Sequence, residues 1–150
     1  MCRRRSGFTL IEVLIVVVIM AVLAATIIPQ FASSTDDAKT SSLDFNLHTI
    51  RSQIEMYKIN HLGNPPSLAK FSDQMTGKTN ISGDTTGTGL DYGPYIQGEI
   101  PANPFNGNNK IVAVATAGTT PTDANGTDGG WQYDETTGDF YPNNSQYFKE

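Results

Sequence analysis

The sequence predicts an α+β fold, in which one long N-terminal helix packs on a small antiparallel β-sheet with long loops. An almost wholly apolar run covers Phe8 to Ile28, and an amphipathic pattern without glycine or proline covers Ala32 to Asn60. Short β-branched or aromatic segments then alternate with stretches rich in glycine, asparagine, threonine and aspartate, as expected for a small sheet. We therefore divide the chain into a leader, an apolar half-helix, an amphipathic half-helix and a small β-rich domain, at residues 1–7, 8–28, 29–62 and 63–150.

Composition narrows the class of protein. The 150 residues suffice for one domain, and their formal net charge is −5. Loss of a leader containing three arginines would make the chain more acidic still, so we expect no nucleic-acid binding, which needs clustered lysine and arginine. Cys2 is the only cysteine. An intramolecular disulfide is therefore excluded, and a thiolate metal site or a cysteine nucleophile is not expected.

The apolar run is long enough to cross a bilayer, which takes about 20 apolar residues. Three arginines precede it and no lysine or arginine follows it closely, which predicts a cytoplasmic N-terminus and an external C-terminal domain. Three interpretations compete: a plain signal anchor, a signal peptide cleaved near Val22-Leu23-Ala24, and a leader cut before the apolar run.

Glu12 distinguishes these interpretations. A carboxylate inside an apolar helix costs roughly 3 kcal/mol on insertion scales. An ordinary anchor or signal peptide gains nothing from it. The alternative is that Glu12, four residues after Phe8, lies near the membrane surface and extends toward the headgroups. Its position in the apolar run favours a functional group that requires a partner.

The segment Arg5-Ser6-Gly7-Phe8-Thr9-Leu10-Ile11-Glu12 resembles the leader junction of type IV pilins and of the pseudopilins of type II secretion. In that family a prepilin peptidase cuts after the glycine, and the new N-terminal residue is N-methylated. The resemblance implies a pilin-like fold, cleavage between Gly7 and Phe8, and N-methylation of Phe8. It also places Glu12 at the fifth mature position, which carries the hallmark glutamate of the family.

The same residues suggest how such a subunit assembles. Cleavage would leave a cationic amine on Phe8, and a buried carboxylate is tolerated when it is paired. We expect Glu12 of one subunit to meet the Phe8 amine of a neighbour and to set the axial register of incoming subunits.

The long helix contains one proline. Pro29 lacks a backbone donor and is expected to kink the helix, as the proline at the matching family position does. The alternative is that Pro29 ends the membrane helix. The kink is favoured because the helical pattern resumes: five residues share one face that should pack on the sheet, namely Leu43, Leu47, Ile50, Ile54 and Tyr57. The breaker residues from Leu62 to Pro66 should end the helix.

In the C-terminal domain we expect a short helix within 67–75, an exposed loop at 77–89, and strands at 110–117, 131–133 and 140–141. The last two should form a hairpin, with Gly138 in a left-handed conformation and the aromatic side chains covering the helix face. The stretch Pro101–Gly107 resembles a segment of secretion-type major pseudopilins, although Asn103 replaces a common acid and Phe105 a common tryptophan.

The loop at 119–130 has two interpretations. The resemblance implies a C-terminal calcium loop, whose carboxylate ligands here would be Asp123 and Asp128. The aspartate spacing differs from the family pattern and from an EF-hand, so a solvated loop without a metal is favoured. No other cofactor is expected.

The sequence contains no P-loop, dinucleotide fingerprint, nucleophile elbow or histidine-based metal pattern, so we expect no catalytic residues and no enzyme. The resemblance implies a structural subunit of a periplasmic pseudopilus that drives protein export. One alternative is a type IV pilin of a surface pilus for adhesion, motility or DNA uptake. Another is a membrane-anchored binding module that does not polymerise, against which Glu12 argues because a lone anchor would leave its carboxylate unpaired.

The resemblance also implies partners and a location. The expected partners are further copies of the chain, minor pseudopilins, the prepilin peptidase, the inner-membrane assembly platform with its ATPase, and the lipid bilayer. The expected location is the bacterial inner membrane, crossed once, with the C-terminal domain in the periplasm.

Overall fold

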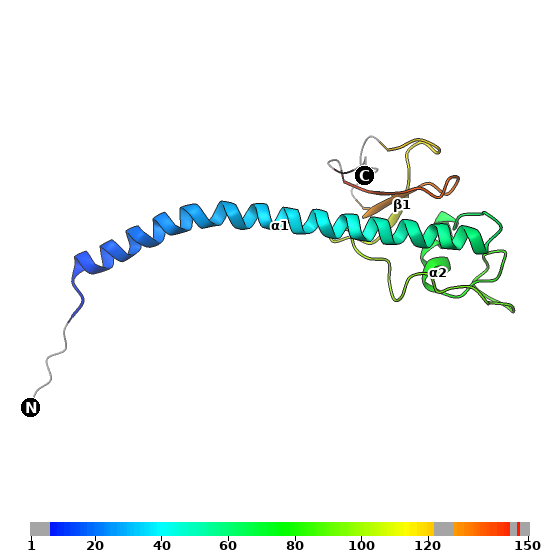
Figure 1. Cartoon of the computed structure of the whole chain (residues 1–150), viewed down its shortest axis with the longest axis horizontal. Helices are drawn as coiled ribbons and strands as arrows, with labels where there is room; N and C mark the ends of the chain where they lie inside the picture. Colours follow the sequence, from blue (N-terminus) through cyan, green and yellow to red (C-terminus); the bar gives the residue numbers. More distant parts are fainter. Residues whose placement is uncertain (1–6, 122–127, 145–146, 148–150) are drawn as a thin grey trace, which may run out of the picture. The chain divides into compact units, whose positions relative to one another are not determined.

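The structure is a computed structural model that describes residues 7–121, 128–144 and 147, with the side chains of 28–33 left aside. It consists of two compact units, one within residues 1–38 and the other within 39–150 (Figure 1). Helix α1, Leu10–Asn60, is the first element. Its first part belongs to the first unit, and its second part carries the core of the second unit.

Helix α1 is continuous for 51 residues and remains helical across Pro29. The interpretation that Pro29 ends the helix is therefore wrong, whereas the kink stays a prediction. The helix ends where expected, because Leu62 and Gly63 adopt left-handed conformations with φ of 60° and 85°. The amide of Gly63 donates to the carbonyl of Lys58 at 2.8 Å, a bond that closes the last turn.

The first unit presents apolar side chains on every side of the helix. Residues Leu10–Ile27 have a mean hydropathy of 3.0 and none of them is buried within the chain. This segment is long and apolar enough to cross a membrane. Side chains of this kind need either lipid or other apolar helices around them.

Five short elements follow α1 in the second unit. They are the 3₁₀ helix η1 (Leu68–Lys70), helix α2 (Phe71–Thr76), and the strands β1 (Ile111–Ala113), β2 (Trp131–Tyr133) and β3 (Phe140–Pro142). The short helix and the hairpin are thus confirmed, and Gly138 has the expected positive φ, 86°. The strand expected at 110–117 is shorter than predicted.

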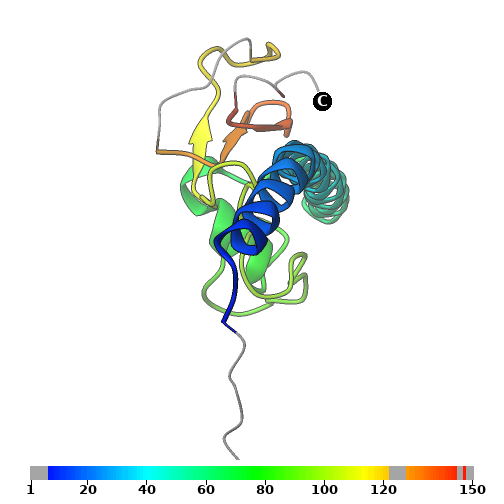
Figure 2. The ribbon, with the colours of Figure 1, turned by 90° about the vertical axis from the view of Figure 1, so that its left-hand side faces the viewer.

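The three strands form a mixed sheet in the order β1-β2-β3, which corrects the expected antiparallel sheet (Figure 2). Strands β2 and β3 pair antiparallel, with Tyr133 opposite Phe140. Strands β1 and β2 pair parallel, with Ile111 opposite Trp131. A parallel pair needs a connection of about a dozen residues or more, which the chain between β1 and β2 supplies.

The core lies between α1 and the sheet. The predicted helix face is buried, and the aromatic side chains of the sheet and α2 cover it, which confirms their expected role. Phe71 packs edge-on against Tyr133 at 4.6 Å between ring centroids, and Trp131 lies 5.3 Å from Phe140. The polar N–H of the Trp131 indole also has a hydrogen-bond partner, because it donates to the Pro101 carbonyl at 2.8 Å.

Two polar contacts tie the hairpin to its surroundings. The Arg51 side chain on α1 donates from Nε to the carbonyl of Phe140 at 2.9 Å. The Asp134 carboxylate accepts hydrogen bonds from the Gly118 amide and from Thr136. Burial raises the pKa of Asp134, but these hydrogen bonds outweigh it and leave the pKa below its ordinary value.

The buried helix face should dominate the stability of the second unit. We expect Ile54→Ala to lower the free energy of unfolding by about 2–5 kcal/mol, because it leaves a cavity under the sheet. The measurement is chemical denaturation of the full chain in detergent, followed by the fluorescence of Trp131, the single tryptophan. Met56→Ala, on the exposed side of the same helix, is the control and should change the free energy by about 0.5 kcal/mol or less. Equal losses from the two variants would contradict this account of the core.

Candidate functional site

The polar groups at the start of α1 form a capping box. Thr9 precedes the first helical residue, and Glu12 occupies the third helical position. The Thr9 amide donates to Glu12 Oε2 at 2.8 Å, and the Thr9 hydroxyl donates to the same oxygen at 2.7 Å. The Glu12 amide in turn donates to Thr9 Oγ1 at 3.4 Å. These reciprocal bonds satisfy backbone donors that have no partner at a helix start.

This geometry corrects one expectation. A lone chain does not leave Glu12 without a hydrogen-bond partner, because Thr9 supplies two donors from three residues away. The negative charge itself is not neutralised by these bonds. Both donors reach Oε2, and among the described residues none donates to Oε1. The capped carboxylate can therefore accept a further donor from another molecule.

Phe8 and Glu12 face the same hollow. It measures about 550 Å³, and Val13, Ile15 and Val16 complete its lining. The Phe8 side chain is 87% exposed, and the apolar side chains beyond it are exposed as well. A carboxylate thus lies at the edge of a large apolar surface that another apolar helix could cover.

Sequence reasoning predicted roles for Gly7, Phe8 and Glu12, which remain predictions, and missed the capping role of Thr9. The structure places Gly7 and Phe8 in the non-helical residues before α1, where a backbone can be reached by a protease. The Thr-x-x-Glu spacing of a capping box was present in the sequence at 9–12 and could have identified Thr9.

The residues that the structure describes do not fit a calcium ion. Asp123 lies outside the described residues. Asp128 is described, but no group of three acidic, histidine or cysteine side chains capable of holding a metal occurs in the described part of the chain. The carbonyl of Asp128 and those of the two glycines after it already accept hydrogen bonds from asparagine amides. These three carbonyl oxygens, which are the type of ligand that calcium prefers, are therefore already hydrogen-bonded.

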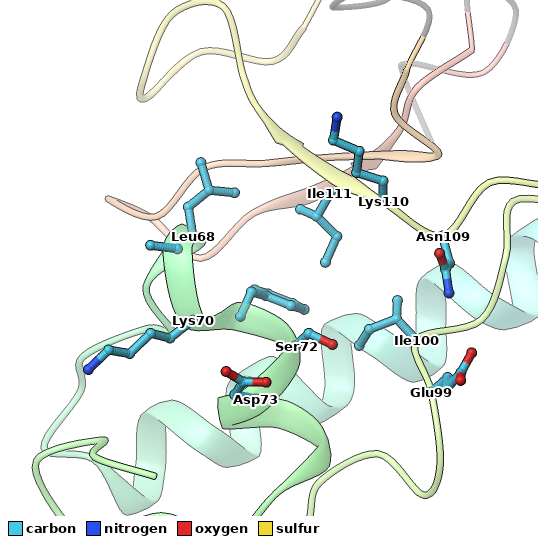
Figure 3. A pocket seen from close by; sticks show the side chains of 11 residues that line it. Leu68, Lys70, Ser72, Asp73, Glu99, Ile100, Asn109, Lys110 and Ile111 are labelled. Atoms are coloured by element: carbon cyan, nitrogen blue, oxygen red, sulfur yellow. The ribbon is translucent and has the colours of Figure 1, made fainter. Parts of the chain in front are cut away.

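A hollow of about 520 Å³ lies between η1, α2 and the start of β1 (Figure 3). Leu68, Ile100 and Ile111 extend into it, whereas Lys70 and Lys110 point away from it. A catalytic or ligand-binding pocket would bring several polar groups together at one point. The charged side chains here diverge, so we assign this hollow no chemistry.

His61, the residue after the end of α1, is buried. Its ring stacks on Tyr57, with 3.7 Å between ring centroids. The Nδ1 atom lies 2.7 Å from the Tyr57 carbonyl and must donate to it, and Nε2 lies 3.0 Å from Thr79 Oγ1. Both ring nitrogens are thus engaged, and His61 joins the helix end to the loop that contains Thr79.

The N-terminal segment matches a known protein family. Residues 2–28 match the family described as the prokaryotic N-terminal methylation motif. This match covers the leader junction, the capping box and the apolar half of α1. It does not extend into the second unit.

Several curated proteins are similar to this chain over most of their length. A type II secretion system core protein G of Pseudomonas aeruginosa is 29% identical over 77% of this chain and 79% of its own. The protein of the same name in Klebsiella michiganensis is 27% identical over 85% and 88%. A type IV narrow pilus major component of Thermus thermophilus is 35% identical over 68% of this chain and 85% of its own. No solved structure matches the chain.

Proposed function

We propose that this chain, which belongs to the family that unites type IV pilins with the major pseudopilins of type II secretion, is the structural subunit of a pseudopilus that drives protein export. Relatives named type II secretion system core protein G cover the second unit as well as the N-terminal helix, which supports this choice. The observation that carries the mechanism is the capped carboxylate of Glu12 at the edge of an apolar helix surface.

Assembly depends on the first half of α1 exchanging lipid for other apolar helices as its surroundings. Its apolar side chains are equally well accommodated by lipid and by a bundle of similar helices, so moving between the two costs little hydrophobic free energy. Glu12 is the group that gains by moving, because its Oε1 can accept a donor from a second subunit. After cleavage behind Gly7, that donor is the cationic amine of Phe8.

The pairing energy is large enough to select one register. Leaving a buried charge without its partner costs about 3–5 kcal/mol. A subunit that enters the filament one helical turn out of place leaves two charges unpaired. The pair between Glu12 and the neighbouring Phe8 amine thus fixes the axial position, while the apolar contacts supply most of the cohesion.

The remaining parts of the system follow from this role. The three arginines before the apolar run keep the N-terminus in the cytoplasm, and the second unit lies in the periplasm. A prepilin peptidase removes residues 1–7 and Phe8 is N-methylated. An inner-membrane platform with its ATPase and the minor pseudopilins complete the assembly. The chain acts by polymerising and not as an enzyme.

A second candidate function is a subunit of a surface type IV pilus. The observation that favours it is the 35% identity to the narrow pilus component, which covers 85% of that relative. The two candidates share the N-terminal mechanism and differ in where the filament extends. A lone, non-polymerising anchor is less consistent with the open Oε1 of Glu12.

The processing site can be tested directly by intact mass spectrometry of the protein purified from membranes. We expect a chain that begins at Phe8 and carries one additional methyl group on its amine. A chain that begins at Met1, or close to Ala25, would contradict cleavage after Gly7.

Two substitutions at Glu12 separate the capping role from the pairing role. Glu12→Gln keeps an oxygen that can accept from Thr9 but removes the charge, and Glu12→Val removes both. We expect both variants to be processed at Gly7 and both to lose most filament assembly, because neither can pair with the Phe8 amine. The measurement is the yield of sheared or cross-linked filaments, with Met56→Ala, on the exposed side of the second half of α1, as the control that should assemble normally. Normal assembly of Glu12→Gln would show that capping alone suffices and would refute the pairing.

A strain that lacks this gene tests the choice between the two candidates. We expect specific exported proteins to remain inside the cell while surface fibres are unchanged, since a pseudopilus serves export. Secreted proteins and surface fibres should be scored in the same cultures, with the gene restored on a plasmid as the control. Loss of fibres or of twitching with intact secretion would instead establish the surface pilus.

A further inference from the structure

Four asparagine side chains surround the backbone that leads into β2. Three of them lie on the segment after Pro101, and the fourth follows β3. The four residues are Asn103, Asn106, Asn108 and Asn143, and we refer to them as the asparagine cluster. The backbone they surround is Asp128-Gly129-Gly130, immediately before Trp131.

Each member of the cluster donates from its amide to this backbone. Asn103 donates to the Gly130 carbonyl at 2.8 Å, and Asn108 donates to the Asp128 carbonyl at 2.8 Å. The Gly129 carbonyl accepts from two members at 3.0 Å each; the donors are Asn106 and Asn143. Three consecutive carbonyl oxygens are therefore held by side-chain amides.

The oxygen of each asparagine is engaged as well. In three members Oδ1 accepts the backbone amide two residues ahead, at 2.9–3.0 Å; the amides belong to Phe105, Asn108 and Lys110. In Asn143 the oxygen accepts from Gln132 Nε2 at 3.1 Å. Each side chain is thus used at both ends, as donor and as acceptor. Aspartate can reproduce the acceptor but not the donor.

The carbonyl oxygens of the two glycines have no capacity left for a cation. A carbonyl oxygen has two lone pairs. The Gly129 oxygen accepts two asparagine amides, and the Gly130 oxygen accepts the Asn103 side chain and the Asn143 backbone amide, the latter at 3.0 Å. Calcium binds through several oxygens with free lone pairs, from carboxylates and carbonyls. Neutral amide donors already supply the positive partners here.

The close approach also depends on glycine. A Cβ atom at Gly130 would lie 1.8 Å from the carbonyl oxygen of Asn108, a distance that no side chain can occupy. The segment 128–130 is therefore pressed directly against the backbone of the asparagine-bearing segment. The arrangement therefore requires a glycine at position 130 and amide donors on the facing segment.

We propose that the asparagine cluster closes the entrance to β2 in place of a calcium ion, so that the second unit folds and keeps its stability without calcium. The cluster joins the segment at 103–108, the entry to β2 and the exit from β3 through hydrogen bonds alone. This inference does not depend on the proposed function, because it concerns the folded state of a single chain.

The first test is thermal unfolding of the full chain in detergent, followed by the fluorescence of Trp131. Trp131 is fully buried and adjacent to Gly130, so it reports on this part of the unit. We expect the same midpoint in millimolar calcium and in EDTA, because only a ligand that binds the folded state raises it. A midpoint that rises with calcium and falls with EDTA would overturn the proposal.

The second test removes one donor while keeping the side-chain shape. In Asn108→Asp the carboxylate can still accept the Lys110 amide but faces the Asp128 carbonyl with an acceptor. We expect the midpoint to fall by about 4–8 °C. Asn106→Asp lies at a more exposed position, and its unfolding midpoint should fall as well. This variant replaces Asn108→Asp in the test if Asn108→Asp does not fold.

Asn46→Asp on α1 is the matched control, because the Asn46 side chain makes no hydrogen bond to the residues that the structure describes. Its midpoint should stay close to that of the unchanged chain. If Asn108→Asp and Asn106→Asp both unfold at the temperature of this control, the amide donors do not hold the segment and the proposal fails.

Discussion

The Glu12 carboxylate needs hydrogen-bond donors in every environment that the first half of α1 enters, because neither a bilayer core nor a bundle of apolar helices offers water. In the single chain Thr9 provides these donors through the capping box. The two Thr9 donors bind one carboxylate oxygen, Oε2, and leave the negative charge without a counter-ion. In the function that we propose, a second subunit supplies the missing counter-ion, and this gain favours assembly.

The second half of the same helix has a different constraint. Its buried stripe must be covered, and the aromatic residues of α2 and the hairpin cover it from the side of the sheet. Because Trp131 and Tyr133 also donate to the carbonyls of Pro101 and Pro66, the loops that carry these prolines are attached to the core. Burial in this environment raises the pKa of Tyr133 far above its ordinary value. A small sheet therefore suffices to organise long loops.

In the described part of the chain, side-chain amides and hydroxyls hold the loops around the sheet. The chain has one cysteine, at position 2, and its described acidic residues form no metal-binding group. The asparagine cluster and the Asp134 contacts take over the connecting role around the sheet.

The sequence by itself determined the long helix and its apolar and amphipathic halves, and it identified Glu12 as a charged residue within the apolar half. These features are local: helical periodicity, breaker residues and a charge in an apolar run can all be recognised within one segment. The capping partner Thr9 is equally local, at a spacing of three residues, and the Thr-x-x-Glu pattern predicts it. The hairpin between β2 and β3 was also predictable, because one short loop joins its strands.

Only the tertiary structure decided the parallel pairing of β1 with β2, the burial of His61 and the asparagine cluster. Each of these joins segments that are distant in the chain, as the bond from Asn103 to Gly130 does across 27 positions. An asparagine in a turn-rich stretch has many local partners, and its own segment does not specify which distant carbonyl it will reach. That choice follows from the packing of the sheet on α1, which brings the segments together.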